Sequence, residues 1–111
     1  LIDEAAFARM ERRPILINTA RGEVVEPRAL LKALREGRIH SAGVDVFPEE
    51  PPGEDWDELL RHPRLIATGH YAWHSVGAAG QLQRRAAENM LAMLGGQDPP
   101  DCLNPRKSGP V

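Results

Sequence analysis

An arginine, a glutamate and a histidine in this sequence could together carry out acid–base chemistry on a small acid: Arg21, Glu50 and His70. An arginine can bind a carboxylate through two parallel hydrogen bonds. A histidine titrates near neutral pH, and a neighbouring carboxylate can fix its tautomer and stabilise its protonated form. If the fold brings the three together, we expect proton transfer on a small carboxylic acid.

Each of the three also has an ordinary structural interpretation. Arg21 lies in a polar loop, where most arginines are solvated charges. Glu50 precedes a proline and is typical of a surface acid in a turn, and His70 is typical of a half-buried histidine at a strand end. A functional role is therefore favoured only if the fold brings these three side chains together at one place.

The segments before these residues are typical of strands in a parallel sheet. Residues 15–17 and 65–67 are short apolar runs without alternation, which indicates strands buried on both faces. Residues 42–47, which are free of charged side chains except for Asp45, also indicate a buried strand. Ligands of open parallel sheets bind at the carboxyl ends of the strands. We therefore expect the three candidate side chains at one edge of the sheet.

Helices are predicted between and after these strands. Asp3 is a suitable N-cap for a first helix that ends before Pro14. Residues 27–37 begin with proline and end with glycine, as helices often do, and residues 58–60 suit one further turn. Residues 75–94 carry apolar side chains three and four apart, which predicts a long amphipathic helix.

The order of helices and strands predicts a layered α/β fold. We expect residues 1–94 to form one unit and residues 95–111, which hold four prolines, to form an extended tail. Three parallel strands are few, because the outer strands of a sheet need cover or partners. The sequence also opens with Leu-Ile-Asp-Glu rather than a leader, so we interpret the chain as a fragment of a two-domain protein.

Composition excludes several classes of partner. Fourteen basic and sixteen acidic residues give a net charge of −2, so no basic field indicates nucleic acid or an anionic membrane, and the pairs Arg12-Arg13 and Arg84-Arg85 are solvated charges. The apolar runs are too short for a membrane span. The single cysteine, Cys102, is typical of an inert thiol in a reducing compartment, and we expect a cytoplasmic protein.

Three motifs in order carry a resemblance to a known family. They are Ile-Leu-Ile-Asn-Thr-Ala-Arg-Gly at 15–22, Ala-Leu-Leu-Lys-Ala-Leu-Arg-Glu-Gly at 29–37, and Gly-Val-Asp-Val-Phe with Glu-Pro at 43–51. Over residues 1 to about 104 the chain closely resembles the D-isomer-specific 2-hydroxyacid dehydrogenases. His-Tyr-Ala-Trp-His-Ser at 70–75 is more similar to the branch that contains the C-terminal-binding co-repressor proteins.

The resemblance implies the C-terminal half of a Rossmann-type parallel sheet with flanking helices, in an NAD- or NADP-dependent enzyme. Such an enzyme transfers hydride between the nicotinamide and a 2-oxo or 2-hydroxy acid, and the family implies a homodimer. By motif position, Arg21 binds the substrate carboxylate and keto oxygen, Glu50 pairs with the histidine, and His70 is the general acid/base. The resemblance places Trp73 near the substrate. The positions that it implies for cofactor contact are Thr19, Ala20, Arg21, Asp45 and His70.

Two features depart from the family pattern. The family usually has proline before the catalytic histidine, whereas this chain has Gly69, whose backbone is less restricted. The dinucleotide fingerprint Gly-x-Gly-x-x-Gly is absent, and with it the segment that selects between NAD and NADP. We therefore expect the fragment alone neither to bind dinucleotide tightly nor to turn over.

Other functions stay open at this point. His70 and His74 are four residues apart, but no third ligand completes a metal site, so we predict none. The main alternative is a dinucleotide-responsive co-regulator or scaffold that has the same fold and little catalytic role. A truncated product without activity is a third possibility.

Overall fold

The computed structural model describes residues 1–104. Contacts divide the chain into two compact units, residues 1–72 and the part from residue 73 onward. The predicted boundary at residue 94 stays a prediction, and residues 105–111 of the predicted tail lie outside the described residues.

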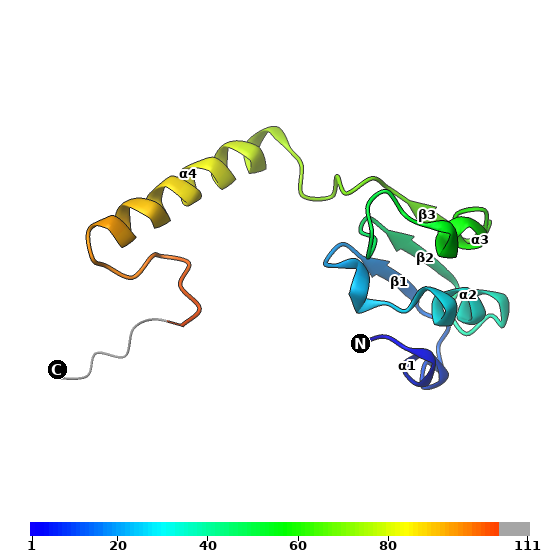
Figure 1. The fold of residues 1–111 in the computed structure, drawn as a ribbon. Coiled ribbons are helices and arrows are strands. Elements are labelled where there is room, and N and C mark those ends of the chain that lie inside the picture. Colours follow the sequence, from blue (N-terminus) through cyan, green and yellow to red (C-terminus); the bar gives the residue numbers. More distant parts are fainter. Residues whose placement is uncertain (105–111) are drawn as a thin grey trace. The chain divides into compact units, whose positions relative to one another are not determined.

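The first unit contains a sheet of three parallel strands in the order β1-β2-β3 (Figure 1). They are β1 (Ile15–Asn18), β2 (Ser41–Val44) and β3 (Leu65–Ala67). The predicted α/β class is therefore confirmed. The second strand is shorter than the predicted 42–47, because its neighbours end at Asn18 and Ala67 and offer no further ladder partners.

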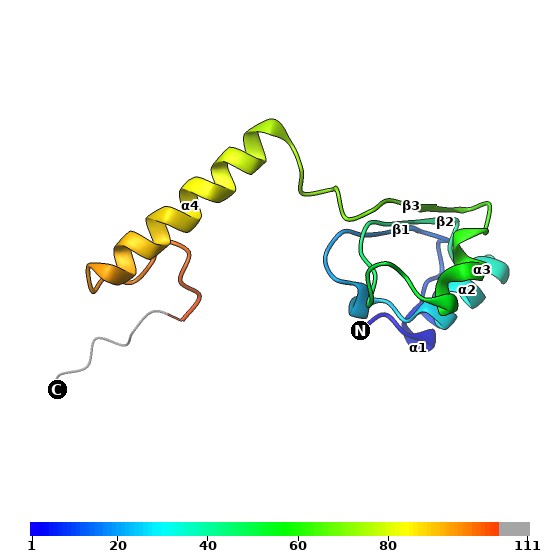
Figure 2. The ribbon, with the colours of Figure 1, turned by 45° about the horizontal axis from the view of Figure 1, so that its top comes forward.

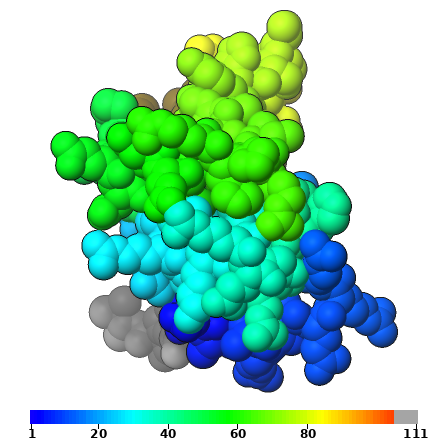
Figure 3. Space-filling model, turned by 90° about the vertical axis from the view of Figure 1, so that its right-hand side faces the viewer, coloured from blue at the N-terminus to red at the C-terminus, as the bar shows by residue number. Residues whose placement is uncertain are grey.

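Three helices cover one face of this sheet (Figure 2). They are α1 (Glu4–Ala8), α2 (Pro27–Arg35) and α3 (Asp57–Leu60). In Figure 3 the blue, cyan and green parts of the chain, to which these helices belong, lie one above another. The carboxylate of Asp3 caps α1 by accepting from the Ala6 N–H at 2.9 Å, as predicted. Gly37 follows α2 with a φ of +70°, which agrees with its expected place after the helix.

The core lies between these helices and the sheet. Leu30 and Leu34 of α2 and Leu59 of α3 are fully buried there, together with Ile39 from the segment before β2. Trp56, in a short 3₁₀ turn at Glu54–Trp56, contacts Phe47 edge to face with ring centroids 4.9 Å apart. The core therefore holds the loop after β2 as well as the helices.

The opposite face of the sheet is bare within the first unit, residues 1–72. Ile15 and Ile17 of β1 are 63% and 73% exposed, and Ile66 of β3 is 73% exposed. Register places Ile17, Gly43 and Ile66 side by side across the strands. The prediction that the strands are buried on both faces is wrong for these residues, because every helix of the first unit packs on the other face.

The second unit contains α4 (Val76–Leu94), which begins where predicted. The Ser75 hydroxyl caps it by accepting from the Ala78 N–H at 3.0 Å. After the helix, the carboxylate of Asp101 accepts bonds from Arg85 and Asn89 and so holds the following segment to α4. Among residues 1–104, no helix combines the length and the apolar character that a bilayer crossing demands.

Candidate active site

Three loops meet at the carboxyl edge of the sheet. They follow β1, β2 and β3 and carry Arg21, Glu50 and His70 respectively. Because the strands are parallel and adjacent, their carboxyl ends share one edge, as the sequence predicted.

His70 and Glu50 are bonded directly. The imidazole Nδ1 lies 3.0 and 2.9 Å from the two carboxylate oxygens, and about two-fifths of each side chain is exposed. A carboxylate can only accept, so Nδ1 carries the proton and donates it to this bond. The other ring nitrogen, Nε2, is thereby left as the atom that can exchange a proton with a ligand.

Glu50 is held as a carboxylate. The bond from His70, and next the Phe47 N–H at 3.2 Å, lower the pKa of the Glu50 carboxyl below its ordinary value. Both donors favour the charged form. The group that orients the imidazole therefore stays ionised at neutral pH.

The loop that carries Arg21 is shaped by Asn18, a buried residue whose role the sequence analysis missed. Its side-chain amide donates to the Arg21 carbonyl at 2.9 Å, and its side-chain oxygen accepts from the Ala20 N–H at 3.1 Å. The Arg21 guanidinium is exposed and donates to the Ala20 carbonyl. An asparagine at the end of a strand, followed by a turn, is the sequence signal that could have indicated this.

Gly22 joins this loop to the one that carries Glu50. Its Cα lies so close to the backbone of Phe47 and Pro48 that a side chain would not fit. Phe47 in turn donates its N–H to Glu50, which binds His70. A continuous set of contacts thus runs from the residue after Arg21 to the imidazole.

Asp45 is buried at the end of β2 and binds the loop of His70. Its Oδ1 accepts from the Thr68 hydroxyl and from the Tyr71 N–H at 2.9 Å, and its Oδ2 accepts from the Ala72 N–H at 2.8 Å. The Thr68 hydroxyl, and then the two backbone N–H groups, lower the pKa of the Asp45 carboxyl.

The remaining predicted residues are less closely tied to this centre. Thr19 and Ala20 are exposed in the loop after β1. Trp73 belongs to the second unit, where its ring contacts His74 edge to face at 5.2 Å, and its predicted substrate contact stays a prediction.

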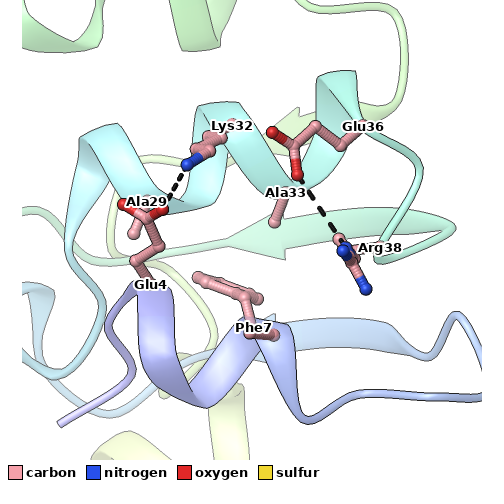
Figure 4. A pocket seen from close by; sticks show the side chains of 8 residues that line it. Glu4, Phe7, Ala29, Lys32, Ala33, Glu36 and Arg38 are labelled. Carbon is pink, nitrogen blue, oxygen red and sulfur yellow. Dashed lines mark hydrogen bonds and ion pairs between the residues drawn. The ribbon is translucent and has the colours of Figure 1, made fainter.

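A separate hollow of about 140 Å³ lies between α1 and α2 (Figure 4). The Phe7 ring faces it, and the ion pairs Lys32–Glu4 and Arg38–Glu36 cross its rim. Its charges already neutralise one another, so it offers no free group for chemistry. Within residues 1–104, no three side chains of metal-binding type lie together.

The edge geometry agrees with the comparisons with known proteins. A model of the family described as "D-isomer specific 2-hydroxyacid dehydrogenase, NAD binding domain" matches residues 1–72. The chain belongs to this family.

Similar proteins include reductases and dehydrogenases of small acids. A glyoxylate reductase of Korarchaeum cryptofilum is 41% identical over 104 residues, which are 94% of this chain and 31% of that protein. A D-lactate dehydrogenase of Lactobacillus jensenii, solved with NAD⁺, superposes with a TM-score of 0.73 at 28% identity, over 89% of this chain and 33% of that one.

A third similar protein was solved with the other nicotinamide cofactor. It is an NADPH-dependent glyoxylate/hydroxypyruvate reductase of Sinorhizobium meliloti in complex with NADP and malonate. Its TM-score is 0.72 at 30% identity, over 84% of this chain and 28% of that one. The chain spans about a third of the length of these relatives.

The residues present fit one end of a nicotinamide cofactor. A carboxamide donates N–H bonds, and Oδ2 of Asp45 accepts one bond from the described residues, which leaves it acceptor capacity. The glycine-rich phosphate loop is absent from this sequence. The Asp45 carboxylate is thus chemically suited to a carboxamide, the group at the reacting end of the cofactor.

Proposed function

We propose that this chain forms the catalytic edge of the cofactor domain of an NAD- or NADP-dependent reductase. The reaction is reversible hydride transfer between the nicotinamide and a 2-oxo or 2-hydroxy acid. The observation that carries the proposal is the bond between His70 and Glu50 at the carboxyl edge of a parallel sheet. The family membership of residues 1–72 supports it.

In this proposal, residues of this chain bind the 2-oxo acid and supply a proton to its keto oxygen. Arg21 holds the substrate carboxylate and polarises the keto oxygen. Protonated His70 gives the proton on Nε2 to that oxygen, while Glu50 keeps Nδ1–H bonded and stabilises the imidazolium. When bound, the nicotinamide supplies the hydride.

The cofactor contacts belong to the same proposal. Thr19 and Ala20, from the loop after β1, and Asp45 would lie beside the nicotinamide end, together with Arg21 and His70. The substrate is a small 2-oxo acid, in keeping with the glyoxylate and hydroxypyruvate named for the relatives. Trp73 would contact that acid. We also propose a homodimer, which the family resemblance supports. The single cysteine, typical of a reducing compartment, supports a location in the cytoplasm.

The test is turnover by the full-length protein that carries this chain. NADH and NADPH consumption is followed with glyoxylate, hydroxypyruvate and longer 2-oxo acids, for the wild type and for His70→Ala. Loss of a general acid costs about 10²- to 10⁴-fold in rate. The matched control is His40→Ala, because His40 is exposed just before β2, at the other end of that strand.

The possible outcomes separate the two functions. Turnover that His70→Ala abolishes and His40→Ala preserves supports the reductase. Tight NADH binding without turnover of any acid would favour the co-regulator, and near wild-type turnover by His70→Ala would disprove the role of His70.

A further inference from the structure

We propose that Asp45 is a positioning residue: it binds the Thr68 hydroxyl before His70 and two backbone N–H groups after it, and thereby orients the imidazole. We call this set of hydrogen bonds the clasp. This inference deepens the proposed function and rests on it for its catalytic meaning. It adds to Asp45 a role separate from the cofactor contact that the family resemblance implies.

The contacts of Asp45 surround His70 without touching it. The carboxylate accepts from Thr68, two residues before the histidine, and from the N–H groups of Tyr71 and Ala72, the two residues after it. All three donors therefore come from one five-residue segment. Asp45 is only 4% exposed, so these bonds are shielded from water.

The segment needs such a clasp because His70 has an uncommon backbone conformation. Its φ is +64°, in the left-handed region that residues other than glycine rarely adopt. Such a conformation persists only where surrounding contacts determine it. The bonds to the next two N–H groups supply that determination, and the imidazole then reaches Glu50 at 2.9 Å.

Asp45 can act as an anchor because the sheet holds it. Its own N–H donates to the Asn18 carbonyl at 2.9 Å, and the Thr68 N–H donates to the Val44 carbonyl at 2.9 Å. Asp45 thus stands at the end of a hydrogen-bonded ladder. A site residue fixed by a regular element is placed more precisely than one that a loop alone supports.

A purely electrostatic role for Asp45 would have a different signature. The negative charge of Asp45 raises the pKa of the Glu50 carboxyl, whereas the bond from His70 lowers it. If Asp45 acts only by charge, Asp45→Asn lowers the pKa of Glu50 further. If Asp45 positions His70, the same variant loosens the His70–Glu50 bond and raises that pKa toward its ordinary value.

The experiment is a ¹³C NMR titration of the Glu50 carboxyl in the 111-residue chain. Asp45→Asn replaces one acceptor oxygen by an amide nitrogen, which cannot accept a hydrogen bond from the donors that face it. Thr68→Val removes one of the three donors and keeps the charge. Asp55→Asn is the matched control, because Asp55 is an exposed acid that pairs only loosely with Arg28, at 3.9 Å.

We expect the Glu50 midpoint to rise in Asp45→Asn, to rise less in Thr68→Val, and to stay unchanged in Asp55→Asn. A fall or no change in folded Asp45→Asn overturns the proposal. If Asp45→Asn does not fold, Thr68→Val decides: a rise supports the clasp, and an unchanged midpoint overturns it. A loss of stability alone would not move this midpoint in the folded protein.

The titration needs neither cofactor nor substrate, so it separates this inference from the proposed function. A raised midpoint beside an inactive full-length wild type would leave the clasp standing and remove the reductase. In an active full-length enzyme, we expect Asp45→Asn to lower kcat by about 100-fold, because a displacement of about 1 Å costs that much. The substrate KM, which depends on Arg21, should change much less, and a change in KM alone would contradict the clasp.

Discussion

The backbone of Gly22 packs against that of Phe47 so closely that no Cβ atom on Gly22 would fit beside the Phe47 carbonyl carbon. This approach joins two loops that are 25 residues apart along the chain (47 − 22). One carries Arg21 and the other carries Glu50. The placement of Arg21 relative to the His70–Glu50 pair therefore depends on the absence of a side chain at Gly22.

Gly22→Ala should destabilise the first unit strongly. The added methyl would meet backbone atoms of Phe47 and Pro48, which cannot rotate away, so we expect a loss of about 3 kcal/mol in the free energy of unfolding. Urea unfolding measures it. The control is Gly43→Ala, whose Cβ would find an ordinary contact at 3.9 Å from Ile17 and should cost less than about 1 kcal/mol. Equal losses in both variants would refute the close approach.

Asn18→Ala should both destabilise the unit and disorder the loop of Arg21. The substitution removes the donor to the Arg21 carbonyl and the acceptor for the Ala20 N–H. An unsatisfied buried group costs about 1–3 kcal/mol. Asn18→Asp keeps the acceptor for the Ala20 N–H but sets a charged oxygen against the Arg21 carbonyl in a buried position, so it should destabilise at least as much as Asn18→Ala. Thermal unfolding compares both variants with the wild type, and wild-type stability in either variant would contradict this account.

Arg21→Ala should weaken substrate capture more than it slows chemistry. The guanidinium is exposed at the carboxyl edge, and the proposed two-bond contact with the substrate carboxylate would be lost with it. In the full-length enzyme we expect KM for the 2-oxo acid to rise about 100-fold, with a smaller fall in kcat. Arg28→Ala is the control, because the Arg28 side chain is exposed and lies in α2. An unchanged KM in Arg21→Ala would remove Arg21 from the site.

Glu50→Gln should change how stability depends on pH. The pKa of Glu50 is lower in the folded chain than the ordinary value, which is about 4.3. The carboxylate therefore contributes stability that is complete above the ordinary pKa and is lost as pH falls through the folded pKa. The stability difference between wild type and Glu50→Gln should be largest above about pH 5 and should shrink on acidification.

Denaturant unfolding at several pH values measures this difference. Glu49→Gln serves as the control, because it removes a neighbouring acid and leaves the bond to His70 in place. We expect the pH dependence of Glu49→Gln to follow that of the wild type. A difference between wild type and Glu50→Gln that stays constant from pH 3 to 7 would contradict the assigned bond.

The two faces of the sheet should respond differently to truncation. Leu30 of α2 is fully buried between the helices and the covered face of the sheet, so Leu30→Ala should cost about 2–5 kcal/mol. Ile17 is 73% exposed on the bare face, so in this chain Ile17→Ala should cost less than about 1 kcal/mol. Urea unfolding of both variants provides the comparison. A large loss in Ile17→Ala would mean that this face is covered.

Much of the fold followed from local patterns in the sequence. The cap at Asp3, the helix over 27–35 and the start of the long helix at Ser75 are set by side chains that act within a few residues. The exposure of Ile17 did not follow, because an apolar strand looks the same whether the helix that covers it belongs to this chain or not. The end of β2 also depended on its neighbours.

The sequence by itself determined which residue types are available for acid–base chemistry and that strands precede them, since both depend on local order along the chain. Family resemblance implied that Glu50 pairs with His70, and the tertiary structure gives the geometry of that bond. Only the tertiary structure decided that Asp45 binds the segment around the histidine and that Gly22 lies against Phe47. These contacts join residues 20 to 26 positions apart, and such distances close only when packing places one strand beside the next.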